Sequence, residues 1–313
     1  MNRDEIETHP CRVLTTEQRA HYFDHGFVDY KSLLDGAWLQ PVRNALAGLV
    51  ERSAGLNAPD GTFDLEPDHS ASDPRLRRVA YLDDLDPTFW ELCTKSPLAD
   101  LAADLLGPDV TFRECLVNYK WARGGSEVKW HQDITFYPHT NLSPLVILVF
   151  VEDILPDQGP PRVVPDSHKG EIFEHYDRDG RWTGHIRHED LSRVPVDRAV
   201  DLTGPAGTVT VHHGCTVHSS APNRSTSSRP LLVVGYSSAD ARPYTACSYP
   251  SSHYLTVVRG KPAKYAHHEA LRMPLPPDWS AGYTSIFAHQ KREERAVGRP
   301  AATQPLTRPP AGS

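Results

Sequence analysis

VTFRECLVNY, residues 110–119, opens a series of short apolar or alternating runs that continues to residue 237. Turn-forming Gly, Pro, Asp and Ser residues separate the runs, and they do not alternate with helical segments as in a parallel α/β sheet. We therefore expect a mainly β protein with flanking α-helices around a double-stranded β-helix (jelly-roll) core. The other runs are LVILVFV (145–151), RVV (162–164), GTVTVH (207–212) and LLVVGYS (231–237).

Helical patterns lie N-terminal to these runs. Residues 37–53 carry apolar side chains at every fourth position, from Trp38 to Val50, which is the spacing of an amphipathic helix. Residues 15–23 begin with a threonine that can cap a helix, and residues 96–106 end at a Gly-Pro pair. We expect a helix in each of these three segments.

The chain is expected to form one domain over residues 1–290, followed by a tail over residues 291–313. The tail is rich in Pro, Arg and Ala with almost nothing to bury, so we expect it to be disordered. Residues 54–75 show little periodicity and predict a loop over the pocket. Within the domain we expect a helical part (1–109), a jelly-roll core (about 110–240) and a C-terminal extension (241–290).

Composition limits the partners and the compartment. A chain of 313 residues can bury a sizeable core, and a net charge of −7 provides no basic surface for nucleic acid. The five cysteines are scattered and never spaced CxxC, so a reducing cytoplasm is the expected location. The sequence has neither a leader-like N-terminus nor a long apolar run, so we expect no membrane partner. It carries no information about oligomeric state.

The sequence WHQD at residues 130–133 is the strongest sign of chemistry. In an extended chain His131 and Asp133 project to the same face, so both can bind one metal while Gln132 points away. His218 is the expected third ligand, brought back by a distant strand. Two histidines and a carboxylate on one face of an octahedral iron leave the other face open for an oxo-acid and dioxygen.

A second HxD, at residues 188–190, calls for an alternative interpretation. A lone HxD is a weak signal in a chain with 17 histidines, and this second one lies in a charged stretch that predicts a loop or a helix start. The first pair is distinguished by its aromatic neighbours and by a downstream histidine followed by an arginine. We favour a metal site at the first pair over a purely structural one.

Arg229 follows His218 by eleven residues. An iron oxygenase of this class must hold a dicarboxylate whose far carboxylate needs a planar, bidentate partner, and arginine supplies that better than lysine. Ser220 shares the face of His218 in an extended chain and can donate its hydroxyl to the same carboxylate. The alternatives are a surface arginine at a strand start and a turn-capping serine.

The chain resembles the phytanoyl-CoA dioxygenase (PhyH) family of non-haem Fe(II)/2-oxoglutarate-dependent oxygenases from Leu14 to about Phe287. It departs from the usual family pattern at Pro161 and Asp166, which concerns the shape of one turn. The motifs that carry the resemblance are Asn118-Tyr119-Lys120, Trp130-His131-Gln132-Asp133, Gly159-Pro160, Val164-Pro165-Asp166-Ser167-His168-Lys169-Gly170 and His218-Ser219-Ser220-Ala221-Pro222-Asn223 with Arg229.

The resemblance implies that His131, Asp133 and His218 bind Fe(II), and that Arg229 with Ser220 holds the distal carboxylate of 2-oxoglutarate. Asn118 is similar to the family's amide contact to this cosubstrate, and we rank it above Lys120 on the same strand face. Dioxygen is the other cosubstrate, and ascorbate is an expected aid in vitro.

The implied activity is hydroxylation of an unactivated C–H bond of a small molecule, for instance in secondary metabolism, with release of succinate and CO2. Related halogenases replace the carboxylate with a small residue, so Asp133 disfavours halogenation. The same iron–oxygen chemistry can also end in desaturation, epimerisation or ring formation. The sequence lacks a basic cluster suited to a CoA nucleotide. The alternative from another class is a jelly-roll metal-binding protein without oxygenase activity, which would not need Arg229.

Residues near the ligands are candidates for the substrate pocket, although aromatic residues at such places are more often simply part of the core. The candidates are Phe136, Tyr137, His139, Trp121 and Arg162.

Overall fold

The computed structural model describes residues 2–283 and 285–290 of the chain. The strands are β1 (Phe27–Tyr30), β2 (Phe63–Leu65), β3 (Leu76–Val79), β4 (Val110–Lys120), β5 (Val128–His131), β6 (Leu145–Phe150), β7 (Pro161–Val163), β8 (Val200–Asp201), β9 (Val209–His213), β10 (His218–Ser220), β11 (Arg229–Ser238) and β12 (Val257–Arg259). The α-helices are α1 (Arg3–Glu7), α2 (Thr16–His25), α3 (Gly36–Ser53), α4 (Leu82–Leu85), α5 (Pro87–Lys95) and α6 (Leu98–Leu106).

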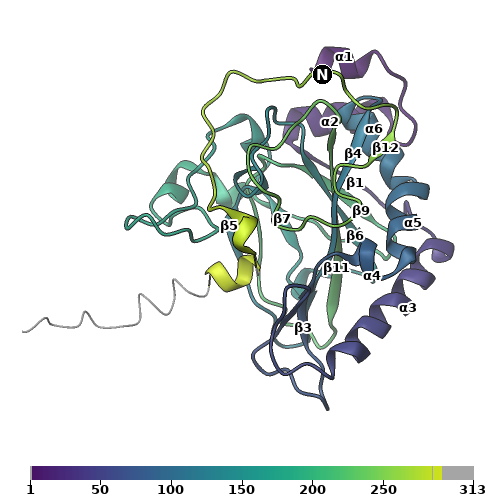
Figure 1. Cartoon of the computed structure of the whole chain (residues 1–313), viewed down its shortest axis with the longest axis vertical. Coiled ribbons are helices and arrows are strands. Elements are labelled where there is room, and N and C mark those ends of the chain that lie inside the picture. Colours follow the sequence, from purple (N-terminus) through teal and green to yellow (C-terminus); the bar gives the residue numbers. More distant parts are fainter. Residues whose placement is uncertain (1, 284, 291–313) are drawn as a thin grey trace, which may run out of the picture.

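The strands form two antiparallel sheets. The larger has the order β1-β9-β6-β11-β4-β3-β2 with β12 added on β4, and the smaller has the order β5-β10-β7-β8. Figure 1 shows α3 and α5 along one side of the large sheet, whereas β5 and β7 lie on its other side. Strands that are adjacent in the large sheet can be distant in sequence: β4 and β11 pair although more than a hundred residues separate them. This is the predicted jelly roll with flanking helices, so the fold prediction is confirmed.

Strand β4 shows how the large sheet separates two environments. Between Glu114 and Lys120, beyond a register shift in its pairing with β11, its side chains alternate because successive residues of a strand point to opposite faces. Cys115, Val117 and Tyr119 belong to the main apolar cluster with the helices. The intervening Leu116 and Asn118 line a cavity between the two sheets. One face of the sheet therefore stabilises the fold, and the other is available for chemistry.

The three predicted helices are present as α2, α3 and α6, and α2 shows why its sequence starts and stops it. The Thr15 hydroxyl accepts a hydrogen bond from the Gln18 amide at 3.1 Å, and the Gln18 side chain accepts one from the Thr15 amide at 2.9 Å. This reciprocal cap satisfies two donors that the first turn leaves free. Gly26 ends the helix at φ 81°, and a Cβ there would lie 2.7 Å from the Thr216 hydroxyl. Glycine meets both requirements.

The predicted loop over residues 54–75 is wrong in part, because β2 lies within it and pairs with β3. A three-residue edge strand carries too few alternating positions to be recognised by periodicity. The C-terminal extension contributes β12, which pairs with β4. The extension then returns to the small sheet, where the Lys129 amide donates to Gln290. Figure 1 shows this last helical segment, in yellow, beside β5.

None of the helices in the described part of the chain is long and apolar enough to cross a bilayer. The predicted disordered tail at 291–313 lies outside the described residues. The single domain over 1–290 stays a prediction.

Candidate active site

The predicted metal ligands converge in the small sheet. Strands β5 and β10 pair antiparallel with His131 directly opposite His218, and their ring centroids are 4.0 Å apart. Strand β5 ends at His131, and Asp133 begins a 3-10 turn, yet its carboxylate still reaches both imidazoles. The His131 Nε2 to Asp133 Oδ1 distance is 3.5 Å, and the His218 Nε2 to Asp133 Oδ2 distance is 3.6 Å. One donor atom from each of the three residues lies within 4.8 Å of the others, so the group can hold a metal ion.

Backbone carbonyls orient both imidazoles. His131 Nδ1 lies 2.8 Å from the carbonyl oxygen of Lys129, and His218 Nδ1 lies 2.9 Å from that of Thr216. A carbonyl only accepts, so each Nδ1 carries the proton and each Nε2 presents its lone pair toward Asp133. Burial, together with the neighbouring His131, lowers the pKa of His218 well below its usual value. The neutral tautomer needed for metal binding is therefore favoured.

His212 is a site residue that the sequence analysis missed. Its Nε2 lies 3.0 Å from Asp133 Oδ2 and it lines the same cavity. Burial opposes ionisation of Asp133, but the adjacent His218, His131 and His212 outweigh it and hold the carboxyl pKa well below its ordinary value. The available signal was parity: in GTVTVH the apolar Val209 and Val211 pack with the helices, so His212 must face the other way.

Gln132 points away from the ligands, as the two-residue strand period predicts. It is fully buried and fixes the segment that follows β7. Its side-chain amide donates to the carbonyl oxygens of Glu171 (3.0 Å) and Cys215 (2.8 Å) and accepts from the Phe173 amide (2.9 Å). Its backbone amide donates to His175 Nε2 at 3.0 Å. These hydrogen bonds anchor the backbone between His131 and Asp133 to residues 171–175 and to Cys215.

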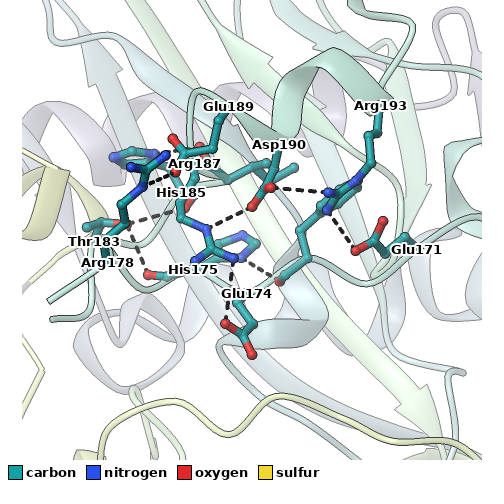
Figure 2. Close-up of polar contacts among 12 residues, drawn as sticks. Glu171, Glu174, His175, Arg178, Thr183, His185, Arg187, Glu189, Asp190 and Arg193 are labelled. Carbon is teal, nitrogen blue, oxygen red and sulfur yellow. Dashed lines mark hydrogen bonds and ion pairs between the residues drawn. The ribbon is translucent and has the colours of Figure 1, made fainter. Parts of the chain in front are cut away.

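The second HxD, residues 188–190, lies in a network of ion pairs at the surface (Figure 2). Glu189 accepts from Arg178 at 2.8 Å, and Asp190 accepts from Arg187 at 2.8 Å. Asp190 also lies 3.3 Å from Arg193. Because arginines occupy both carboxylates, this second motif stabilises a loop, in agreement with the structural interpretation of it.

Arg229 is a buried cation at the start of β11. It is 2% exposed, its Nη2 donates to the carbonyl of Gly159 at 2.8 Å, and its Nε has no hydrogen-bond partner. Among the residues the structure describes, none supplies a carboxylate to it. Burial lowers its pKa from 12.5 to about 9. A guanidinium that is desolvated and unpaired is suited to an anionic ligand.

Lys120 lies opposite Arg229 in the β4–β11 register, but two backbone carbonyls already accept hydrogen bonds from its side chain. Its Nζ donates to the carbonyl oxygens of Ser220 (3.0 Å) and Ala221. Burial, and then the charge of Arg229, lowers its pKa well below the usual value. The Asn118 amide oxygen accepts from Arg78 Nε at 2.8 Å, which leaves the Asn118 NH2 group for another partner.

A cavity of about 130 Å³ lies at the centre of these residues. All six residues assigned by sequence line it: His131, Asp133, His218, Arg229, Ser220 and Asn118. Phe136 and Tyr137 also line it, whereas His139, Trp121 and Arg162 do not. Arg162 instead pairs with Asp201 at 2.7 Å.

The remaining wall of the cavity comes from segments that sequence reasoning did not connect to the site. The expected cover, residues 54–75, contributes nothing to the lining, and the C-terminal extension takes its place. The residues involved are Ser248, Tyr249, Tyr283, Ile286 and Phe287, with Arg78 and Glu114 from the large sheet.

The chain is similar to a known protein family and to several characterised enzymes. The profile of the phytanoyl-CoA dioxygenase (PhyH) family matches residues 22–231. A probable alpha-ketoglutarate-dependent hypophosphite dioxygenase of Stutzerimonas stutzeri is 30% identical over 285 residues, covering 88% of this chain and 96% of the relative. The L-proline trans-4-hydroxylase of Streptomyces griseoviridis is 32% identical over 171 residues, covering 49% of this chain and 64% of that enzyme.

Solved structures agree on the fold. EctD from S. alaskensis, crystallised with 2-oxoglutarate and 5-hydroxyectoine, superposes with a TM-score of 0.63 at 23% identity, covering 84% of this chain and 88% of EctD. The carbocyclase SnoK from nogalamycin biosynthesis gives a TM-score of 0.59 at 23% identity, covering 75% of this chain and 89% of SnoK. With its jelly roll and its His-Asp-His group, the chain belongs to the phytanoyl-CoA dioxygenase (PhyH) family and is an Fe(II)- and 2-oxoglutarate-dependent dioxygenase.

Proposed function

We propose that His131, Asp133 and His218 hold the iron, and that this enzyme hydroxylates an unactivated C–H bond of a small molecule. The observation that carries the proposal is the convergence of the three donor groups inside one cavity. When bound, iron supplies the oxidising chemistry: one oxygen atom of O2 enters the substrate, and the other enters 2-oxoglutarate as it breaks down to succinate and CO2. Four neighbouring side chains orient the ligands or bind the cosubstrate: His212, Arg229, Ser220 and Asn118.

His212 and the two backbone carbonyls keep the ligands in place. The carbonyls of Lys129 and Thr216 fix the imidazole tautomers, and His212 holds the Asp133 oxygen that faces it. Partners of this kind orient metal ligands and raise their affinity. These contacts support the proposal because they orient the three side chains toward one another.

We assign the distal carboxylate of 2-oxoglutarate to Arg229, with Ser220 and Asn118 as further contacts. The buried Arg229 has unused donors and no acidic partner among the described residues, so the donor set fits a dicarboxylate. Ser220 and Asn118 line the same cavity, and the Asn118 NH2 group has no assigned acceptor. A plain metal-binding protein has no need of a buried cation at this position.

The dimensions of the cavity favour a small substrate. Its volume of about 130 Å³ is well below the roughly 300–1,000 Å³ typical of pockets for drug-sized ligands. The similar proteins named for hypophosphite and L-proline have substrates of this size. The hypophosphite enzyme is matched over 96% of its length, which makes oxidation of a P–H bond the second candidate reaction. The cytoplasm remains our proposed location, supported by five free cysteines.

The proposal is tested by metal binding and by succinate formation. Wild-type protein supplied with Fe(II), 2-oxoglutarate and ascorbate should release succinate, and Asp133→Ala should lose both iron binding and turnover. His188→Ala, in the second HxD, is the matched control and should retain both. Iron binding without succinate release, over a panel of small amino acids and oxyanions, would contradict the proposed hydroxylation of a small molecule. A product that gains one oxygen atom identifies hydroxylation, and one that loses two hydrogens identifies desaturation.

A further inference from the structure

Two adjacent arginines on β3 differ in how their charges are balanced. Arg77 forms a bidentate ion pair with Asp64 on the neighbouring β2, at 2.8 and 2.7 Å. Arg78 points to the opposite face of the sheet, where it lines the iron-site cavity. Both side chains are 7% exposed, so the difference between them is one of partners and not of burial.

The hydrogen-bond and ring partners of Arg78 are all neutral. Its Nε donates to the Asn118 amide oxygen at 2.8 Å, and its Nη1 donates to the Tyr249 hydroxyl. Its guanidinium carbon lies 5.4 Å from the Tyr249 ring centroid and 5.7 Å from that of Phe287. In the described part of the chain, none of the carboxylates forms an ion pair with it. The Arg78 guanidinium is protonated at neutral pH, so this is a full buried charge.

Neither the metal nor the cosubstrate balances this charge. The charges of Fe(II) and Arg229 are matched by Asp133 and the two carboxylates of 2-oxoglutarate. Glu114, the other acid in the cavity, interacts first with Arg113, whose Nη2 lies 3.4 Å away, and less strongly with Arg78, so one carboxylate faces two arginines. The cavity therefore keeps an uncompensated positive charge at Arg78 when the proposed metal and cosubstrate are bound, and buried charges require a partner.

Arg78 is also separate from the position we assign to 2-oxoglutarate. Arg78 pairs with Asn118 across the β3–β4 edge, while Arg229 pairs with Lys120 across the β4–β11 edge. Strands β3 and β11 therefore lie on opposite sides of β4, which places the two arginine backbones about 10 Å apart across the sheet. One small dicarboxylate anchored on Arg229 and on the metal leaves Arg78 for a second anion.

We propose that Arg78, positioned by Tyr249 and Asn118, binds an acidic group of the substrate. The ligand class is a small molecule with a carboxylate or an inorganic oxyanion, both of which match the planar donor fork of arginine. The inference rests on the proposed function and deepens it, because it gives the substrate a charge. It also assigns the C-terminal extension a role, since Tyr249 comes from that segment.

The test compares acids with their neutral analogues. Calorimetry under anaerobic conditions measures binding of small amino acids, their amides and hypophosphite to wild-type protein loaded with Fe(II) and 2-oxoglutarate. At least one acid should bind, and its amide should bind far more weakly. Arg78→Gln should weaken acid binding about 100-fold. The same substitution should weaken 2-oxoglutarate binding by about tenfold at most. Hypophosphite and amino acids serve as separate arms that distinguish an oxyanion from a carboxylate.

The control is the double variant Arg77→Gln with Asp64→Asn, which removes the neighbouring arginine without leaving a buried carboxylate unpaired. It should bind the acid like wild type. Tyr249→Phe is a milder second variant, expected to weaken acid binding several-fold without removing a charge, in case Arg78→Gln does not fold. The proposal is overturned if amides bind as well as acids, if no acid of the panel binds, or if Arg78→Gln weakens 2-oxoglutarate more than the acid. Succinate release is measured in a separate assay, so a failure of the proposed function is distinguished from a failure of Arg78 to bind the acid.

Discussion

Replacing Arg229 with methionine should change ligand binding and stability in opposite directions. The side chain is buried, unpaired at Nε, and without a carboxylate among the described residues. Its role as an anchor for 2-oxoglutarate predicts a loss of about 3 kcal/mol on removal, or roughly 100-fold in Kd. In the ligand-free protein the same substitution removes an unfavourable buried charge.

The stability effect follows from the lowered pKa. Burial brings the pKa of Arg229 from 12.5 to about 9, which corresponds to roughly 5 kcal/mol of destabilisation by a charged side chain at neutral pH. Loss of the hydrogen bond to Gly159 offsets about 1 kcal/mol of the gain. Because the folded protein releases this proton more readily than the unfolded chain, the penalty is complete below pH 9 and is relieved as pH rises above it. Arg229→Met should therefore raise the Tm of the ligand-free protein by several degrees, and the difference should shrink above pH 9.

Calorimetric titration with 2-oxoglutarate and thermal denaturation of the ligand-free protein measure the two effects. Arg162→Met is the matched control, since Arg162 pairs with Asp201 away from the cavity and should not affect 2-oxoglutarate binding. The reasoning is refuted if Arg229→Met binds 2-oxoglutarate like wild type, or if it lowers the Tm of the ligand-free protein at pH 7.

Three further predictions concern the support of the site. His212→Phe should weaken iron binding about 10- to 100-fold in a chelator competition, because Asp133 loses its orienting contact. Unchanged affinity would show that the contact with His212 does not contribute to iron binding. Gln132→Leu should cost about 2–4 kcal/mol in urea unfolding, since it leaves the Phe173 amide and two carbonyls without a buried partner; a change below about 1 kcal/mol contradicts this. Asp190→Asn should leave iron affinity unchanged, because its carboxylate pairs with Arg187 and Arg193 outside the cavity; weaker iron binding would implicate the second HxD.

The fold was predictable because its signals are local. Alternation from Cys115 to Tyr119 separates a helix-facing side from a cavity-facing side, whereas Val110 and Phe112 also face the helices because a register shift near residue 113 reverses the parity, which the sequence did not reveal. The cap at Thr15 depends only on neighbouring residues, and α2 has it. The edge strand β2 was missed because three residues contain too little pattern, and its pairing with β3 stabilises it from outside the segment.

The candidate site likewise contains residues that the sequence predicted and residues that it did not. His131 and Asp133 were readable from their spacing, and His218, Arg229 and Ser220 from a downstream motif. His212 was within reach, since strand parity assigns it to the cavity face. Arg78 was not readable: in sequence it is identical to its neighbour Arg77, and only the position of Asp64 on one side of the sheet distinguishes a paired arginine from an unpaired one.

By itself, the sequence determined the longer strands, three of the helices and the spacing of His131 and Asp133, because each leaves a pattern among residues a few positions apart. Only the tertiary structure decided which charges remain unpaired and which segment closes the cavity. Tyr249 reaches Arg78 from 171 residues away, and no local pattern encodes such a distance. It results from strand register and from the path of the C-terminal extension, which are set by packing of the whole chain.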